Sequence, residues 1–283
     1  MTARVLQSDV LLAAHFSVRY AGKPLPALRD VALEIRQGEI LGLVGQSGSG
    51  KSTLAMAVLG LLDRKRAQVE GTIKFQDCEL LQLRERQLRG MRGRALALVL
   101  QSPLSSLNPA LRIRTQLKEA WRAHISGSRV DCDAAIRAAL ESVSLPSSDE
   151  FLRKYPSQMS VGQAQRVLIA MAVMHRPALL IADEATSALD VITQSEILAL
   201  FARLNRETGT AILYISHDLA SVAGICDRIA ILHDGQIVEC GPGDQIFENP
   251  QHDYTRRLIA AMPRVPQKIA PSPLAKDAAA GAL

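Results

Sequence analysis

Short apolar runs recur along the chain, and each stops at a polar or glycine-rich position. Apolar runs of strand length, without alternation, are typical of strands that are buried on both faces of a sheet. Together with the helical segments between them, they predict an α/β fold built on a core sheet. We expect these strands at residues 39–44, 95–100, 178–184 and 211–216.

Other segments have the composition or spacing of helices. The apolar segment 52–62 follows the first strand after a short glycine-rich stretch, and residues 111–125 and 132–143 repeat apolar side chains at helical spacing. Because these two amphipathic segments lie between predicted sheet strands, we expect a helical subdomain, at about residues 104–165, inserted into the sheet domain. Further helices are expected at residues 84–94, 164–174 and 243–262.

Alternating patterns flank these elements. Residues 5–38 alternate around Val10 to Val18 and Val31 to Ile35, with a Gly/Pro-rich turn between them, which predicts an N-terminal antiparallel β-layer. A short strand is expected at residues 70–75, and a hairpin at residues 229–239 whose turn is Asp-Gly.

These elements predict a single domain over residues 5–262. Residues 263–283 are rich in Pro and Ala without periodicity, so we expect a mobile tail there.

The composition narrows the class of protein. Of the 283 residues, 48% are hydrophobic and only 4% aromatic, which suits a sheet-and-helix core of aliphatic side chains. The net charge of +5 is mildly basic, but no long block of Lys or Arg appears, so we do not expect nucleic acid as a partner. The longest apolar run, Leu54 to Leu62, is too short to span a bilayer, and no signal peptide is recognisable. We therefore expect any membrane association to come through partner proteins.

The cysteines are scattered, without a C-x-x-C pair. This spacing argues against a zinc site and against a disulfide framework, and it favours a reducing cytosol. They are Cys78, Cys132, Cys226 and Cys240.

A glycine-rich loop lies between the first core strand and the apolar helix, and it fits the pattern G-x-x-x-x-G-K-[ST]. Glycines allow successive peptide N–H groups to curl around an anion, and the helix adds its positive N-terminal end. In this context Lys51 is expected to reach the β- and γ-phosphates of a nucleoside triphosphate, and Ser52 to place its hydroxyl on Mg²⁺. The predicted ATP-binding residues here are Gly45, Gln46, Ser47, Gly48, Ser49, Gly50, Lys51, Ser52 and Thr53.

Polar side chains follow the other core strands. Asp183 and Glu184 end one strand, where Asp183 suits Mg²⁺ and Glu184 suits an attacking water. His217 follows the next strand and could contact the γ-phosphate, and Gln101 follows the strand at 95–100. Because open α/β sheets bind ligands at the carboxyl edge, these residues are expected to share one site.

Two features leave alternatives open on the residues alone. Ser160, Val161, Gly162 and Gln163 precede a predicted helix, where Ser160 suits either a helix cap or a second anion site. Tyr20 suits equally stacking on adenine and packing at the edge of a strand.

Taken together, these segments resemble the nucleotide-binding domain of ATP-binding cassette (ABC) transporters over about residues 8–262. The resemblance implies a RecA-like P-loop core sheet with an N-terminal antiparallel β-layer and an inserted α-helical subdomain. It implies that Gln101 senses Mg²⁺ and the membrane subunit, that His217 is the switch histidine, and that Tyr20 stacks on adenine. It also identifies Ser160, Val161, Gly162 and Gln163, after Met159, as the signature, and Ser187, Ala188, Leu189 and Asp190 as the dimer loop.

The resemblance further implies a mechanism. Two cassettes close head to tail around two ATP molecules, each held between one phosphate loop and the signature of the other subunit. Glu184 orients the hydrolytic water, His217 holds the γ-phosphate, and closure moves two membrane permease subunits. The subunit would lie at the cytoplasmic face of the inner membrane and serve an extracytoplasmic substrate-binding protein indirectly.

Three segments are similar to the oligopeptide, dipeptide and nickel importer ATPases: residues 104–109, the stretch from Ala188 through Val191 to Gln194, and residues 249–258. Several such importers carry clustered cysteines after this point that are thought to hold an iron–sulfur cluster. No cysteine follows Cys240, so we expect no such cluster here. We therefore expect an importer of peptides, nickel or a metal–chelator complex. The alternatives are the energy subunit of an exporter, or a soluble cassette ATPase that acts on ribosomes or DNA.

Two residues depart from the family pattern. Val161 stands where the signature usually has Gly, and Ala185 stands where Pro commonly follows the glutamate. If that position needs close backbone approach or a positive φ, Val161 would weaken the site that holds the partner's ATP. We therefore hypothesise a heterodimer with a second, different ATPase and two unequal sites.

Overall fold

The structure is a computed structural model and describes residues 9–262. Its larger sheet has six strands. All of them are parallel except the strand that comes last in the chain, which forms an antiparallel hairpin with the strand before it. The core strands lie where the apolar runs predicted them, and each is buried along most of its length. In sheet order the strands are β10 (Gln236–Pro242), β9 (Arg228–His233), β3 (Ile40–Val44), β8 (Ala211–Ser216), β7 (Leu179–Asp183) and β6 (Leu96–Val99).

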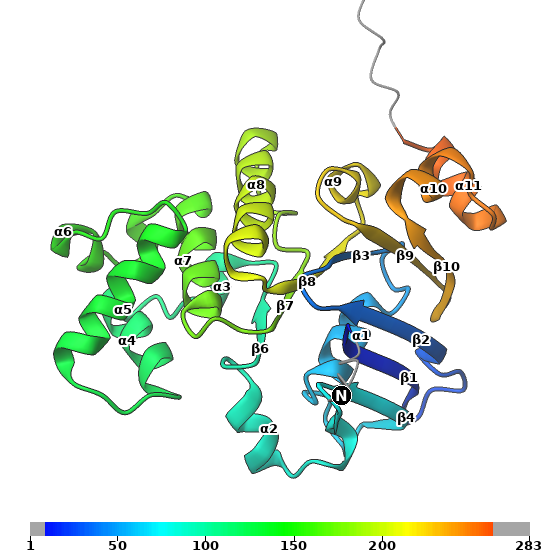
Figure 1. Cartoon of the computed structure of the whole chain (residues 1–283), viewed down its shortest axis with the longest axis horizontal. Coiled ribbons are helices and arrows are strands. Elements are labelled where there is room, and N and C mark those ends of the chain that lie inside the picture. Colours follow the sequence, from blue (N-terminus) through cyan, green and yellow to red (C-terminus); the bar gives the residue numbers. More distant parts are fainter. Residues whose placement is uncertain (1–8, 263–283) are drawn as a thin grey trace, which may run out of the picture.

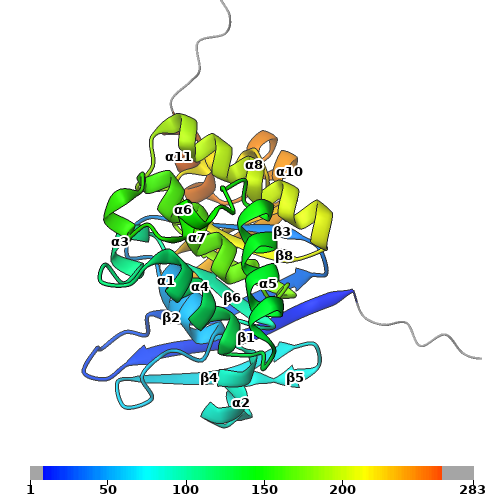
Figure 2. The ribbon, with the colours of Figure 1, turned by 90° about the vertical axis from the view of Figure 1, so that its left-hand side faces the viewer.

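A second sheet of four antiparallel strands confirms the predicted N-terminal layer. One strand is longer than predicted: β4 begins at residue 67 instead of 70, because β1 pairs with it along its whole length, from Tyr20 opposite Ala67 to Leu12 opposite Phe75. Figure 2 shows this layer along one side of the molecule and α8 along the other, with parallel strands between them. The four strands, in sheet order, are β2 (Leu28–Arg36), β1 (Val10–Tyr20), β4 (Ala67–Phe75) and β5 (Cys78–Glu79).

Helix α1 (Lys51–Val58) lies between the two sheets, where Leu54, Ala55 and Val58 join a cluster of buried side chains from both. It ends well before Leu62, the end that the sequence predicted. Gly60 has a positive φ of 61°, which closes the helix. Arg92 then donates hydrogen bonds to the carbonyls of Leu59 and Gly60, at 2.7 Å each, so these helix-end acceptors are satisfied.

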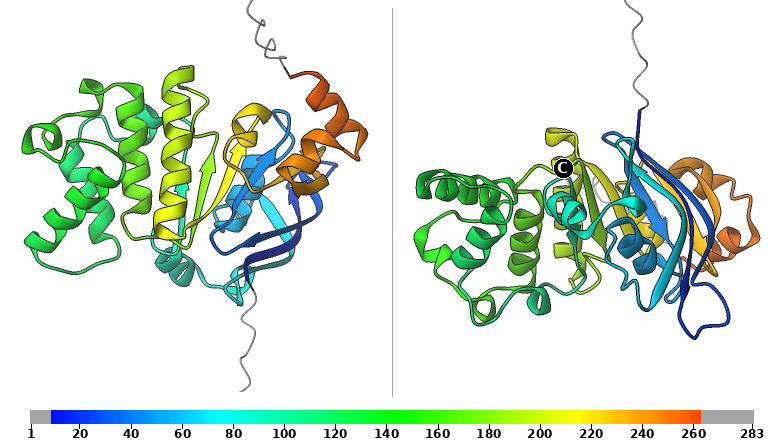
Figure 3. Two further views of the ribbon diagram at one scale, coloured as in Figure 1. Left: turned by 45° about the horizontal axis from the view of Figure 1, so that its top comes forward. Right: turned by 90° about the horizontal axis from the view of Figure 1, so that it is seen from below.

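The helices between β6 and β7 gather on one side of the molecule, opposite α11 (Figures 1 and 3). Their apolar faces share a hydrophobic cluster with β6, β7 and α8. This arrangement agrees with the prediction that a helical segment is inserted into the sheet. These helices are α3 (Pro103–Ser106), α4 (Ile113–Arg122), α5 (Arg129–Ser142), α6 (Asp149–Leu152) and α7 (Val161–Val173), with a 3₁₀ turn, η2 (Pro156–Gln158), before α7.

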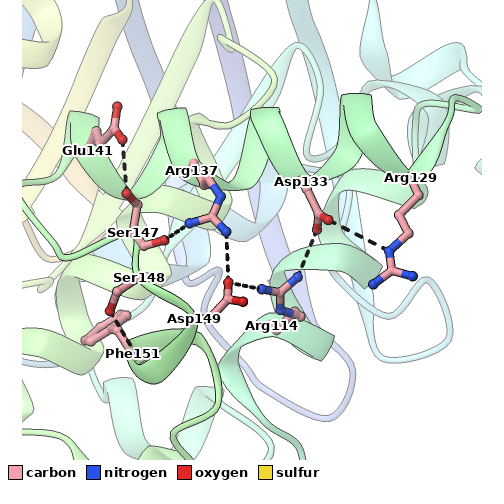
Figure 4. A network of polar contacts seen from close by, with 9 residues as sticks. All are labelled: Arg114, Arg129, Asp133, Arg137, Glu141, Ser147, Ser148, Asp149 and Phe151. Atoms are coloured by element: carbon pink, nitrogen blue, oxygen red, sulfur yellow. Dashed lines mark hydrogen bonds and ion pairs between the residues drawn. The ribbon is translucent and has the colours of Figure 1, made fainter.

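A network of charged side chains joins three of these helices (Figure 4). Arg114 of α4 contacts Asp133 of α5 at 3.1 Å and Asp149 of α6 at 2.7 Å, and Arg137 of α5 contacts Asp149 at 2.8 Å. Ser148 caps α6 by accepting a hydrogen bond from the N–H of Phe151. The network therefore fixes the orientation of the short α6 against two longer helices.

The C-terminal part does not form the continuous helix predicted at 243–262. It forms two short helices, because Asn249 leaves the helical region and Pro250 follows it. The remaining elements are η1 (Leu80–Gln82), α2 (Glu85–Met91), α8 (Val191–Thr208), α9 (Leu219–Ala223), α10 (Gly243–Glu248) and α11 (Asp253–Ala260).

Within residues 9–262, none of the helices has the length and apolar character needed to cross a membrane. The first residues of the predicted domain and the predicted tail at 263–283 lie outside the described residues.

Candidate nucleotide-binding site

The glycine-rich loop connects β3 to α1 at the carboxyl edge of the six-stranded sheet. Two glycines are required by the surroundings. A Cβ at position 45 would lie 2.2 Å from the carbonyl oxygen of Leu232, and Gly50 has a φ of 110° with the side chain of Leu28 directly against it. The loop therefore presents a bare backbone at the N-terminus of α1, as an anion site requires.

Lys51 is buried, with 5% of its surface exposed, and its ammonium group is held by the loop itself. Nζ donates to the carbonyls of Gly45 at 2.8 Å and Gln46 at 3.0 Å, and lies 3.8 Å from a carboxylate oxygen of Glu184. Burial lowers the pKa of Lys51, while the nearby carboxylates of Glu184 and Asp183 oppose that shift. The loop thus positions a cation directly beside two acids.

Asp183 is the last residue of β7 and is buried, and its Oδ1 has no hydrogen-bond partner within the described chain. Burial raises the pKa of its carboxyl group, and a hydrogen bond from Ser52 works against that rise. An orphaned buried carboxylate oxygen beside a serine hydroxyl is the kind of oxygen donor pair that fits Mg²⁺. Among residues 9–262, no group of three or more His, Cys, Asp or Glu side chains is placed to hold a metal ion by itself.

Glu184 follows directly and has a left-handed φ of 49°, which is strained for a residue with a side chain. Its N–H donates to the carbonyl of Ile215 on β8, which holds this turn in place. One carboxylate oxygen faces Lys51, and the other lies 3.5 Å from Nδ1 of His217. His217 is about half exposed and follows the end of β8. The structure therefore brings Lys51, Glu184 and His217 together.

Gln101 is exposed and follows β6, whose Val99 pairs with Ala182 of β7. The register places Gln101 at the same edge of the sheet as Asp183. It precedes the loop that is tied to α4 by Gln116, a buried residue that the sequence did not single out.

Tyr20 is half-buried and is the last residue of β1. Its hydroxyl lies 3.3 Å from that of Thr53 on α1, so the ring stands beside the phosphate-loop helix. The residue lines a hollow of about 500 Å³ together with basic side chains from two segments. These are Arg19, Lys23, Arg64, Lys65 and Arg66.

The signature residues form the first turn of α7, which begins at Val161 and not at Ala164 as predicted. Ser160 caps the helix by accepting a hydrogen bond from the N–H of Gln163, and the side chain of Gln163 accepts from the N–H of Ser160. Val161 is not among the residues with positive φ, so the backbone there does not require glycine. Of the two reasons considered for the Gly that the family usually has at this position, the close approach of another molecule is the one that remains.

The predicted dimer loop is fixed directly beside Glu184. The N–H and hydroxyl of Ser187 both donate to the carbonyl of Glu184, and Asp190 caps α8 through the N–H groups of Ile192 and Thr193. Ser187, Ala188 and Asp190 are exposed and Leu189 is half-buried.

Another residue touches the phosphate loop without having been predicted as a site residue. The hydroxyl of Tyr254, on α11, accepts a hydrogen bond from the N–H of Gln46 at 3.3 Å. The sequence placed Tyr254 only within a segment similar to the C-terminal part of peptide importer ATPases. Nothing local in the sequence signals a contact across 208 positions.

A comparison with family models matches residues 28–187 to the "ABC transporter" model, which spans more than half of the chain. The chain belongs to the ABC transporter family. A second model, "Oligopeptide/dipeptide transporter, C-terminal region", matches residues 238–280. Both matches confirm the resemblance drawn from the motifs.

Curated relatives of this ABC chain are ATP-binding proteins. It is 39% identical over 265 residues to the glutathione import ATP-binding protein GsiA of Salmonella paratyphi A, covering 91% of the chain and 42% of that protein. It is 38% identical over 252 residues to the dipeptide transport protein DppD of Bacillus subtilis, covering 89% of the chain and 75% of DppD. It is 41% identical over 239 residues to the oligopeptide transport protein OppD of Salmonella typhimurium, covering 84% and 71%. The chain thus spans about two fifths of the length of GsiA.

Solved structures confirm the fold. The ATP-binding cassette MJ0796, in a dimeric post-hydrolysis state bound to ADP and phosphate, matches with a TM-score of 0.70 and 28% identity, over 82% of this chain and 98% of that one. CbiO1 from Clostridium perfringens, part of an ABC transporter complex, matches with a TM-score of 0.74 and 25% identity, over 85% and 92%.

Proposed function

We propose that this chain is the ATP-binding and ATP-hydrolysing subunit of an ABC importer, with a nucleotide-binding domain that carries a helical subdomain at about residues 104–165. The observation that carries the proposal is the meeting of Lys51, Asp183, Glu184 and His217 at one edge of the sheet, beside a phosphate loop. A buried cation, two acids and a histidine around a bare loop match the groups that phosphoryl transfer to water requires.

Each residue has a distinct role in this reaction. The loop N–H groups and Lys51 bind the phosphates and stabilise the charge that develops on the γ-phosphate. Glu184 accepts a hydrogen bond from the attacking water and orients it, and His217, which contacts the same carboxylate, holds the γ-phosphate. Ser52 and Asp183 would hold Mg²⁺, with Gln101 at the same edge, and the ion would neutralise charge on the phosphate oxygens.

The reaction site needs a second cassette to be complete. The signature turn and the dimer loop both lie on the surface, and a Cβ at Gly162 would lie 2.7 Å from the side chain of Thr193 on α8, so the two segments adjoin. Val161, Val191 and Ile192, on these segments, are 37%, 82% and 75% exposed. Exposed apolar side chains around a capped helix N-terminus suit a subunit interface that closes on the ATP of the partner. We assign this place to a second, different ATPase.

A hollow beside the Gln101 loop suits the membrane permease. It has a volume of about 370 Å³ and is lined by Val99 of β6 and Leu100 directly after it, by Ala120 and His124 around the end of α4, and by Met171 of α7. Because side chains of both the sheet and the helical subdomain line this hollow, a short amphipathic permease segment that binds there would contact both. Two permease subunits are expected in the complex, one for each cassette.

The substrate class follows from the relatives, whose names specify glutathione, dipeptide and oligopeptide transport. We propose a peptide or peptide-like substrate, with nickel or a metal–chelator complex as the alternatives, delivered by an extracytoplasmic binding protein. The subunit would act at the cytoplasmic face of the inner membrane.

A pull-down tests the assignment to an importer. Tagged Glu184→Gln protein is recovered with ATP and Mg²⁺ from detergent-solubilised membranes, because loss of the water-orienting carboxylate should trap the closed dimer. Two permeases together with a different ATPase are the expected partners. Recovery of ribosomal or DNA-repair proteins in their place would refute the transporter assignment.

A further inference from the structure

The C-terminal part of the chain holds the phosphate loop at several points. The carbonyl of Leu232, at the end of β9, lies against Gly45 so closely that a Cβ there would clash. In the hairpin turn, the N–H of Gly235 donates to the carbonyl of Ser49 at 3.1 Å. Tyr254 of α11 then accepts from the N–H of Gln46. These contacts bracket the loop from its first residue to its fifth.

The hydroxyl of Tyr254 is held in a fixed position. Its ring is 4% exposed and stacks on the ring of His233, with centroids 3.8 Å apart and planes 13° from parallel. The start of α11 is anchored to β10, because the carboxylate of Glu239 accepts from the N–H groups of Gln251 at 2.7 Å and His252 at 3.0 Å. His252 in turn caps α11 by accepting from the N–H of Tyr254. A fixed hydroxyl can position the loop that it contacts.

The contact reaches the functional lysine through one residue. Gln46 donates its N–H to Tyr254, and its carbonyl accepts from Nζ of Lys51 at 3.0 Å. A shift of Gln46 therefore changes the position of a ligand of the lysine that is proposed to bind the phosphates. Gln46 is exposed, and its other hydrogen bonds, from the N–H of Ser49 and from Lys51, both come from within the phosphate loop and the start of α1.

We propose that Tyr254 is a positioning residue for the phosphate loop, through which the C-terminal segment sets the affinity of the loop for ATP. The inference rests on the proposed function of the loop as an ATP site. Residues 238–262 lie within the match to the oligopeptide/dipeptide transporter C-terminal model. The proposal gives these residues a role in nucleotide binding.

The test replaces Tyr254 with Phe in the full chain, which removes the hydroxyl and keeps the stacked ring. ATP affinity is measured by displacement of a fluorescent ATP analogue, KM and kcat are measured on the complex recovered from membranes, and hydrogen exchange is followed in a peptide that contains Gln46. We expect the dissociation constant and KM for ATP to rise about three- to fivefold, which lies within the range for loss of one neutral hydrogen bond. We also expect little change in kcat or in the melting temperature, and faster exchange at Gln46.

Tyr155→Phe is the matched control, because it removes a hydroxyl that also accepts a 3.3 Å hydrogen bond, from Nε of Arg112 in the helical region. It should leave ATP affinity and exchange at Gln46 unchanged. If Tyr254→Phe binds ATP as the unaltered chain does and exchanges Gln46 at the same rate, the inference is overturned and the proposed function stands. If the unaltered chain binds no ATP, both are overturned.

Discussion

The strained conformation of Glu184 explains how two adjacent acids at the end of β7 serve different purposes. Asp183 completes the strand and stays buried, whereas the left-handed φ of Glu184 turns the chain immediately afterwards. Strain at a residue is retained when neighbouring contacts fix it. Here the N–H of Glu184 bonds to β8, and its carbonyl accepts from Ser187 of the dimer loop. The proposed water-orienting residue is therefore connected directly to the proposed subunit interface.

Val161 permits a sharper prediction than the sequence alone. Because its φ is not positive, the bulk of the side chain is the remaining obstacle to a partner nucleotide. In the heterodimer, Val161→Ala and Val161→Gly should both accelerate hydrolysis at the partner site. Val161→Gly should also lower the free energy of unfolding by about 0.5 kcal/mol, from the poorer helix propensity of Gly. Urea unfolding and the ATPase rate of the heterodimer measure these effects, and an unchanged rate in both variants would refute unequal sites.

At the residue scale, the sequence predicted those site residues that belong to local patterns. The phosphate loop, Asp183, Glu184 and His217 each follow an apolar strand, and parallel strands bring their carboxyl ends to one edge. Tyr254 could not be found in this way, because its contact with Gln46 depends on how α11 packs on the sheet. The positive φ of Glu184 could not be predicted either, because Glu is not a residue type that favours positive φ.

Gln116 on α4 shows how an element can be held by one buried amide. It accepts from the N–H of Asn108 and donates to the carbonyls of Asn108 and Leu111, which fixes the loop that follows Gln101. Gln116→Ala should lower the free energy of unfolding by about 2 kcal/mol, since several buried hydrogen bonds are lost together. Chemical denaturation measures the loss. Glu119→Ala, on the exposed side of the same helix, is the control, and an equal effect of both substitutions would contradict this account.

The anchorage of α11 should depend on pH. Burial alone would raise the pKa of Glu239, but hydrogen bonds from the N–H groups of Gln251 and His252 hold it below its ordinary value of 4.5. A carboxylate with a lowered pKa stabilises the folded state above its ordinary pKa, and that stabilisation is lost as the pH falls through the lowered value.

We therefore expect the amides of residues 253–260 to lose protection as the pH falls below about 4.5, after correction for the intrinsic pH dependence of exchange. Glu239→Gln should show reduced protection already at pH 6 and a smaller acid-dependent change. Identical pH profiles for the two proteins would show that Glu239 does not anchor α11.

At the element scale, the predicted elements were largely correct in type, and the errors concern their ends and the helix predicted at 243–262, which is two short helices. Helix α1 is shorter than its apolar run because Gly60 adopts a positive φ and Arg92 satisfies the carbonyls there. Strand β4 is longer because β1 pairs with all of it. Both ends are decided by partners distant in the sequence, which local patterns do not contain.

At the scale of the whole molecule, the chain supplies one side of the proposed ATP site, and a second subunit would supply the other. Its loop, acids and histidine face one nucleotide, while its signature turn lies on the surface, where it would serve another subunit's nucleotide. In the proposed heterodimer, Val161 would place the weakened signature on the partner's ATP. The site formed by Lys51 and Glu184 would then be the productive one.

The most direct test compares two complexes, each recovered from membranes through the tagged chain, one with the unaltered chain and one with Glu184→Gln. The rate of ATP hydrolysis is measured for both. ATP binding is measured on the same samples. The account predicts equal binding and a rate at least about 100-fold lower for Glu184→Gln, which is the size expected for removal of a residue that orients the attacking water. An undiminished rate with intact ATP binding would contradict it, because hydrolysis would then not depend on Glu184.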